Sequence, residues 1–149
     1  MEKHKKFLSM AIDLAKTNVE NGGRPFGAII TLKDEVISTG INEIVRSLDP
    51  TSHAELNAIK EASFKLKTPN LEGCVVYASG QPCPMCLAAI HMCGIKEVYF
   101  ANSNEYGEPY GLSTERVYQE MRKPLLEQAI KIHHLPLVND LYKIWVSKS

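Results

Sequence analysis

Residues 71–90 read LEGCVVYASGQPCPMCLAAI and place a short apolar strand directly before a helix. The run from Cys74 to Ser79 is made of small, β-branched and aromatic residues, which is typical of a buried strand. Pro84 suits the first turn of the helix that follows, and Gly94 suits its C-terminal cap. A strand that leads straight into a helix is the repeating unit of α/β proteins.

The segments on either side extend this unit into a layered domain. Apolar residues recur at three- and four-residue intervals over residues 3–20, which predicts a helix, and residues 26–32 and 36–40 form a hairpin pattern. Later patterns predict helices over 53–66, 113–122 and 139–147, and strands over 98–100 and 128–133. The chain of 149 residues therefore predicts one domain, residues 1–149, folded as a three-layer α/β/α sandwich around a mixed five-stranded sheet.

Two short motifs, SHAE at 52–55 and PCPMC at 82–86, carry residue types that bind transition metals. The spacing of Cys83 and Cys86 puts both sulfur atoms on one side of a helix's first turn, where free backbone N–H groups and the positive end of the helix dipole favour thiolates. His53 begins a second predicted helix. Two helix N-termini could thus meet at one zinc ion, with an imidazole and two sulfur atoms as ligands.

Glu55 is separated from His53 by one residue, which corresponds to about 200° around a helix. The two side chains should therefore not approach a metal from the same direction, and the carboxylate is better placed to serve a water molecule or a substrate. Three protein ligands also leave one zinc position for water, and zinc lowers the pKa of bound water to about 7. The pattern predicts a hydrolytic enzyme.

Other functions are compatible with parts of this pattern. A Cys-Pro-x-Cys sequence between a strand and a helix is also typical of thioredoxin-like redox sites. That alternative predicts a reversible disulfide between Cys83 and Cys86 without metal, and a structural zinc module predicts zinc without an exchangeable water. Cys74 and Cys93 lie in apolar segments and are expected to be small core residues.

Charge and hydropathy limit the partners of the chain. Its 17 basic and 17 acidic residues balance, so it lacks the positive field expected of a nucleic-acid-binding protein. No apolar run approaches the roughly 18 residues of a membrane-spanning helix, and the N-terminus lacks the apolar core of a signal peptide. We expect a cytoplasmic protein with no membrane partner.

Several segments resemble the cytidine deaminase-like superfamily of zinc deaminases. They include 71–90 and the segments RPFGAII at 24–30, GINEIV at 40–45, DPTSHAELNAI at 49–59 and IKEVYFA at 95–101. The order His-x-Glu and then Pro-Cys-x-x-Cys is that family's general signature. Within the superfamily the chain is most similar to bacterial guanine deaminases, with tRNA adenosine deaminases as near relatives.

This resemblance implies a fold, an activity and a set of site residues. The fold would be the same α/β/α sandwich, usually in a homodimer. The activity would be hydrolytic removal of an exocyclic amino group from a small nucleobase-like substrate such as guanine, with release of ammonia; a tRNA wobble adenosine deaminase is the alternative. His53, Cys83 and Cys86 would hold Zn²⁺ and Glu55 would shuttle protons, while the substrate base would be bound by Asn42, Phe26 and the backbone N–H of Ala54.

The chain departs from guanine deaminases at one position. Those enzymes carry an acidic residue after the fourth strand that reads the far edge of the base, and this position falls near Thr114, with Glu115 beside it. A hydroxyl does not pair with guanine as a carboxylate does, so we expect Thr114 or Glu115 to influence specificity. Tyr142 and Trp145, near the C-terminus, are expected either to pack in the core or to close a pocket of this chain or a partner.

Overall fold

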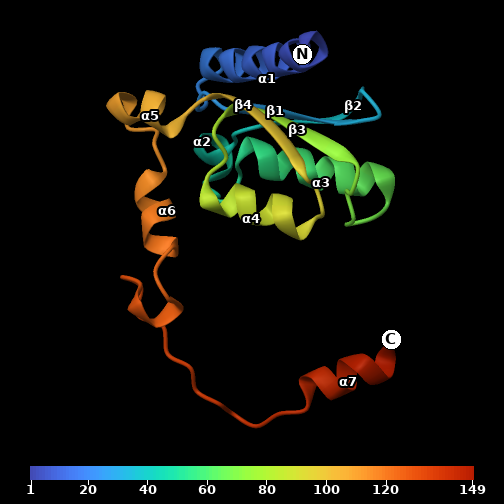
Figure 1. Ribbon diagram of the computed structural model, residues 1–149, viewed down its shortest axis with the longest axis vertical. Helices are drawn as coiled ribbons and strands as arrows, with labels where there is room; N and C mark the ends of the chain where they lie inside the picture. The colour runs from blue at the N-terminus through green and yellow to red at the C-terminus, as the bar shows by residue number, and fades with distance from the viewer.

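The computed structural model describes residues 1–149 and places helices on both faces of one sheet (Figure 1). The sheet has the strand order β2-β1-β3-β4. Helix α1 (Glu2–Glu20) covers one face, and α3 (Ala54–Leu66) and α4 (Pro84–Met92) cover the other. This arrangement confirms the three-layer α/β/α sandwich predicted from the sequence.

The pairing of the strands determines where the sheet presents its loops. Strand β1 (Gly27–Leu32) is antiparallel to both β2 (Glu35–Ile41) and β3 (Cys74–Gly80). Strand β3 is parallel to β4 (Glu97–Asn102), and α4 lies between them in the chain. The carboxyl ends of β3 and β4 therefore meet at one edge of the sheet, which is where ligands bind in many α/β proteins.

Side chains alternate between the two faces of the sheet, as the pleat requires. On the side of α3 and α4, strands β1 and β3 bury Ala28, Ile30, Val76 and Ala78. On the side of α1, Ile29 and Tyr77 pack with Phe7. The sheet is thus buried on both faces, which gives the site at its edge a rigid support.

Helix α3 packs unusually close to β2 at Gly40. A β-carbon at this position would lie 2.1 Å from the backbone oxygen of Ala54 and 2.6 Å from the backbone nitrogen of Ala58. The hydroxyl of Ser38, on the same strand, donates a hydrogen bond of 2.8 Å to the Ala58 carbonyl. These contacts hold the N-terminal half of α3 against the sheet.

The close approach predicts that Gly40→Ala destabilises the protein by about 1–3 kcal/mol, because the clashing atoms belong to the backbone and α3 would have to shift. Chemical denaturation followed by circular dichroism measures the effect. Gly107→Ala is the matched control, since the nearest atom to its β-carbon would be at 3.4 Å, an ordinary contact. Equal unfolding midpoints for the two variants would contradict this role of Gly40.

The start of α3 differs in detail from the sequence prediction. The N-cap residue is His53, and no side chain caps the helix, although two hydroxyl groups precede it. Both hydroxyl groups have other partners: the Thr51 hydroxyl donates to Asp49, and Ser52 Oγ accepts from the Asn57 side chain. The segment between β2 and α3 also contains a short helix, α2 (Ile44–Ser47).

The prediction of a fifth strand was wrong. The sheet has four strands, and residues 128–133 form none. After β4 the chain runs through α5 (Asn104–Gly107) and α6 (Glu115–Met121) away from the sheet, so this apolar segment has no neighbouring strand to pair with (Figure 1). A strand pattern forms a strand only where a partner supplies the hydrogen bonds.

The C-terminal helix was predicted correctly, but of the two roles expected for its aromatic residues, packing in the core of this chain was wrong. Helix α7 (Leu141–Lys148) lies apart from the layers of the sandwich (Figure 1). Every residue from 133 to 149 is exposed. Tyr142 is 87% and Trp145 70% exposed, so neither residue packs in the core of this chain.

Candidate active site

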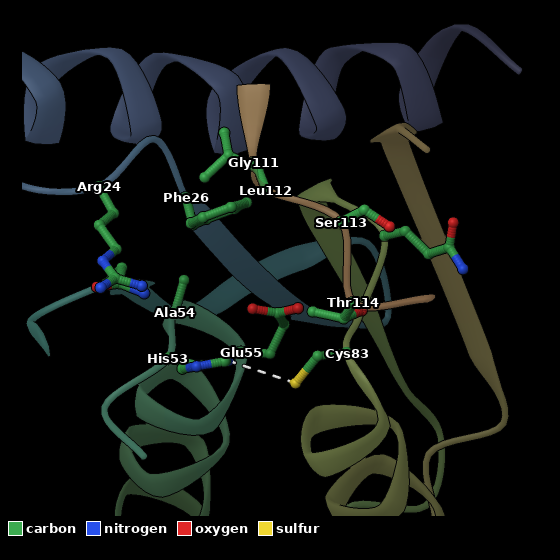
Figure 2. Close-up of a pocket in the computed structure, with 12 residues that line it drawn as sticks. Arg24, Phe26, His53, Ala54, Glu55, Cys83, Gly111, Leu112, Ser113 and Thr114 are labelled. Atoms are coloured by element: carbon green, nitrogen blue, oxygen red, sulfur yellow. Dashed lines mark hydrogen bonds between the residues drawn. The ribbon is translucent and has the colours of Figure 1, made fainter. Parts of the chain in front are cut away.

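The side chains of His53, Cys83 and Cys86 converge on one point between two helix N-termini. His53 Nδ1 lies 3.4 Å from the sulfur atom of Cys83 and 3.4 Å from that of Cys86. The two sulfur atoms are 3.5 Å apart. His53 is the N-cap of α3 and Cys83 the N-cap of α4, so the two helices bring the residues together as the sequence analysis expected (Figure 2).

The donor set fits a zinc ion. Zinc lies about 2.3 Å from sulfur and 2.0 Å from nitrogen ligands, so neighbouring corners of a zinc tetrahedron are about 3.5–3.8 Å apart. The three distances between the donor atoms match this spacing closely. No fourth histidine, cysteine, aspartate or glutamate joins the group, so the residues supply three of four tetrahedral corners.

Electrostatics favours a negative charge at the sulfur pair. The thiols of Cys83 and Cys86 share a hydrogen bond, which lowers the pKa of Cys83 and raises that of Cys86. The backbone N–H of Cys86 also donates to the Cys83 sulfur at 3.4 Å. The hydrogen bond to Cys83 raises the pKa of His53. The first proton is therefore lost readily from Cys83, as a cation site requires.

Glu55 lies beside this group without joining it. Glu55 is only 7% exposed, and burial raises the pKa of its carboxyl group to about 7. In Figure 2 the carboxyl group points into the pocket, toward the wall that contains Thr114. A carboxyl group that titrates near neutral pH is well suited to accept and return a proton.

A pocket of about 280 Å³ opens beside His53 and Cys83, slightly below the range of about 300–1,000 Å³ that is typical of ligand sites. Its walls come from the start of β1, the end of β2, the start of α3, the end of β3 and the segment 111–114 (Figure 2). Asn42, Phe26 and Ala54, the residues expected to bind a base, all line this pocket.

Asn42 is held so that only one end of its amide is free. Its Oδ1 accepts a hydrogen bond of 3.0 Å from the backbone N–H of Ile44, and its backbone carbonyl accepts one of 2.8 Å from the Asn18 side chain. The Nδ2 group is left to donate. Ala54, the first residue of α3, also has a backbone N–H that lacks a partner within the helix. The pocket therefore offers two donors to a ligand.

Of the two residues expected to influence specificity, the structure brings one into the pocket. Thr114 lines it, whereas Glu115 is not among the lining residues. The Glu115 carboxylate forms an ion pair of 3.4 Å with Arg122. Between β4 and the pocket the chain forms α5 and a single 3₁₀ turn, η1 (Glu108–Tyr110).

Several lining residues were not predicted from the sequence, namely Arg24, Gln81, Gly111, Leu112 and Ser113. The first two lie next to motif residues in the sequence, since Arg24 opens the RPFGAII segment and Gln81 precedes Pro82. That adjacency could have indicated them. Ser113 likewise lies beside Thr114, which was predicted. Gly111 and Leu112 become neighbours of the site only through the path of the chain after β4, for which the sequence carries no comparable signal.

Comparison with known proteins agrees with this geometry. Residues 1–102 match the family described as the cytidine and deoxycytidylate deaminase zinc-binding region. The chain is 37% identical over 145 residues to guanine deaminase from Bacillus subtilis, covering 95% of this chain and 93% of that protein. It is 38% identical over 132 residues to a tRNA-specific adenosine deaminase from Aquifex aeolicus, covering 88% of this chain and 84% of the relative.

Comparison of the fold with solved structures also shows similarity to a guanine deaminase. The crystal structure of guanine deaminase from Bacillus subtilis matches with a TM-score of 0.88 at 36% identity, covering 97% of this chain and 93% of that one. The match includes the zinc-binding family's motifs and extends almost to the C-terminus. The chain therefore belongs to the cytidine and deoxycytidylate deaminase zinc-binding family.

Proposed function

We propose that this protein is a zinc-dependent hydrolytic deaminase that removes the exocyclic amino group of a small purine-like base such as guanine and releases ammonia. One observation carries the proposal. The donor atoms of His53, Cys83 and Cys86 converge at distances that suit zinc, and the adjacent pocket holds the buried carboxyl group of Glu55, which is not part of this donor set. Similarity to guanine deaminase over nearly the whole chain supports it.

His53, Cys83 and Cys86 would hold the metal. Zinc bound with three protein ligands supplies an acidified water molecule and a positive charge at the reacting centre. The positive charge would also favour the ionised form of Glu55, which burial alone disfavours. The pocket is small and partly apolar, so it would exclude bulk water from the reacting atoms.

Glu55 would move the protons. Its carboxylate would accept one proton from the attacking water and give it to the ring nitrogen next to the amino-bearing carbon. It would then accept the proton of the hydroxyl group newly bonded to that carbon and give it to the departing amine, so that a carbonyl and ammonia result. The Nδ2 group of Asn42 and the backbone N–H of Ala54 would donate to acceptor atoms of the base. Phe26 would contact a face of the ring. Together these groups would hold the reacting carbon beside Glu55, within reach of its protons.

A free base fits the pocket better than tRNA does. The chain has equal numbers of basic and acidic residues, and phosphate recognition in nucleic acids usually requires a dedicated basic surface. Arg24 is the one basic residue besides His53 that lines the pocket. Similarity to the adenosine deaminase from Aquifex aeolicus keeps tRNA as the second candidate.

Ammonia release tests the proposal. We expect the zinc-loaded protein to release ammonia from guanine, and we would compare guanine with adenine, cytosine, their nucleosides and a tRNA carrying a wobble adenosine. Release from tRNA alone would favour the second candidate. A reversible Cys83–Cys86 disulfide in metal-free protein, with no release from any substrate, would favour a redox module instead.

We also propose that the working form is a homodimer, in which the C-terminal segment of each chain, residues 124–149, packs on the other chain. This segment exposes many large apolar side chains that a monomer would leave in water, among them Leu135, Leu137, Leu141, Tyr142, Ile144 and Trp145. Strand β4 is at the edge of the sheet, so it offers unpaired backbone groups. In a symmetric dimer, a second copy of the chain would cover both the apolar C-terminal segment and the free edge of β4.

Size-exclusion chromatography with light scattering tests the dimer. We expect the full chain to elute as a dimer and Trp145→Asp to shift it toward monomer, because a charge would be buried in the apolar interface. Lys143→Asp, on the same helix, is the control that should leave the dimer intact. A wild-type protein that is monomeric at high micromolar concentration would contradict the proposal.

Each chain would act as one domain in a reducing compartment such as the cytoplasm. All four cysteines are free, and the two at the site must stay reduced to bind a metal. None of the helices combines the length and apolar character needed to cross a bilayer.

A further inference from the structure

The Thr114 side chain, at the pocket wall, has a defined partner inside the protein. Asn104 Oδ1 accepts hydrogen bonds from the Thr114 backbone N–H at 3.2 Å and from the Thr114 hydroxyl at 3.4 Å. Asn104 is only 8% exposed, and both contacts are partly buried. Asn104 therefore controls how Thr114 faces the pocket.

The direction of these bonds follows from the backbone. An N–H group only donates, so the atom of Asn104 that faces Thr114 has to be the carbonyl oxygen and not the NH₂ group. Because that oxygen only accepts, the hydroxyl proton of Thr114 points toward Asn104. The lone pairs of Thr114 Oγ1 then remain to accept a hydrogen bond from a ligand in the pocket.

Asn104 is itself held in place by the edge of the sheet. Its backbone N–H donates to Gln81 Oε1 at 2.9 Å, and the backbone N–H of Gln81 donates to the Asn102 carbonyl at 2.7 Å. These bonds tie the carboxyl ends of β3 and β4 together. Since Gln81 and Thr114 both line the pocket, one connected set of hydrogen bonds runs from the sheet to the pocket wall.

The other end of the Asn104 amide is left without a partner. Its Nδ2 atom is buried and makes no hydrogen bond. An apolar side chain would avoid leaving this donor unpaired, but it would remove the acceptor that Thr114 uses. The unpaired Nδ2 group is therefore a consequence of using an asparagine here, whose Oδ1 accepts the two hydrogen bonds from Thr114.

We propose that Asn104 is a positioning residue that fixes the Thr114 hydroxyl as a hydrogen-bond acceptor, so that the pocket selects bases that present a ring N–H group to this part of its wall. This inference rests on the proposed deaminase function and specifies its substrate. A neutral hydroxyl pairs with one N–H donor and leaves the pocket wall uncharged. Bases that present an acceptor at this edge would face unpaired lone pairs and bind less well.

Four variants test the positioning role through guanine kinetics. Thr114→Val and Asn104→Leu are each expected to lower kcat/KM by about threefold to tenfold, mainly through KM, since each removes one oriented neutral hydrogen bond. The double variant Asn104→Leu/Thr114→Val should be no worse than either single variant, because both act on the same contact. Asn104→Asp should keep most of the activity, since a carboxylate also accepts from Thr114.

Methylated bases identify the N–H group. Guanine carries two ring N–H groups, one at N1 and one on the imidazole ring at N7 or N9. 1-Methylguanine lacks the first, and 7-methyl- and 9-methylguanine both lack the second. We expect Thr114→Val to lower kcat/KM for guanine and for the analogues that keep the recognised donor, and to leave it unchanged for those that lack it, which are 1-methylguanine if the donor is at N1 and the other two if it is on the imidazole ring. A merely structural role of Thr114 would lower all four values by the same factor.

Amide hydrogen exchange provides a readout that is independent of activity. The backbone N–H of Thr114 should be protected in wild-type protein and in Asn104→Asp, and should exchange faster in Asn104→Leu. Unchanged guanine kinetics and unchanged exchange in Asn104→Leu would overturn the inference while leaving the deaminase function intact. If wild-type protein released no ammonia from any of the four bases, the proposed function would fail, and this inference with it.

Discussion

Glu55→Gln is expected to lower kcat for ammonia release by about 10⁴-fold while the protein still binds one zinc ion per chain. General acid–base catalysis commonly contributes about 10²–10⁴ in rate, and here one carboxylate would act on the water, the ring nitrogen and the leaving amine. Glutamine has nearly the same shape but neither accepts nor returns a proton in this way. Steady-state kinetics and metal analysis on the same preparation measure both effects.

Glu61→Gln is the matched control for this prediction. Glu61 lies on the same helix, α3, but is exposed and remote from the pocket lining. It should retain full activity. A Glu55→Gln variant that keeps wild-type kcat would show that the carboxyl group does not carry protons. Loss of zinc from that variant would instead show that Glu55 is a ligand.

Cys83→Ser is expected to weaken zinc binding by more than about 100-fold, because it removes one of three protein ligands, whereas loss of a group that only supports a ligand already costs about 10- to 100-fold. Thermal stability should fall with the metal, since the site joins the N-termini of α3 and α4. Metal analysis after gel filtration and melting curves with and without chelator measure the two effects.

Cys93→Ser is the control for the thiol substitution. Cys93 is buried outside the site, and its thiol donates to the Ile90 carbonyl at 3.4 Å, a bond that a serine hydroxyl is able to replace. This variant should bind zinc with wild-type stoichiometry. Equal zinc content in Cys83→Ser and wild type would rule out Cys83 as a ligand.

The centre of the site was predictable because its residues act through local geometry. A Cys-x-x-Cys pair at a helix start points two sulfur atoms the same way, and the His-x-Glu spacing turns Glu55 away from the ligands. The structure brings His53, Cys83 and Cys86 within bonding distance of one point, as that reasoning expected. Asn42 and Phe26, by contrast, entered the prediction only through family resemblance, although both line the pocket.

The wall of the pocket was less accessible to sequence reasoning. Asn104 and Thr114 are ten residues apart, and their contact depends on how α5 and η1 turn the chain after β4. Nothing in the local pattern of either residue indicates that one orients the other. Arg24 and Gln81 differ from this pair, because each lies beside a motif residue in the sequence and could have been predicted from it, although it is the sheet that brings the start of β1 and the end of β3 together.

The C-terminal segment shows where apolar patterns mislead. Residues 128–133 and one face of α7 have the composition of buried elements. Whether they are buried depends on which surface covers them. Within one chain nothing does, and the expected fifth strand does not form. A sequence pattern reports that a surface is to be buried, but not whether the covering surface belongs to the same chain.

A crystal structure with anomalous diffraction recorded at the zinc absorption edge tests the central claim most directly. We predict one zinc ion per chain, bound to His53 Nδ1 and to the sulfur atoms of Cys83 and Cys86, with a water molecule at the fourth position and Glu55 hydrogen-bonded to that water. A fourth protein ligand at the metal, or protein purified without chelator that holds no zinc, would contradict it.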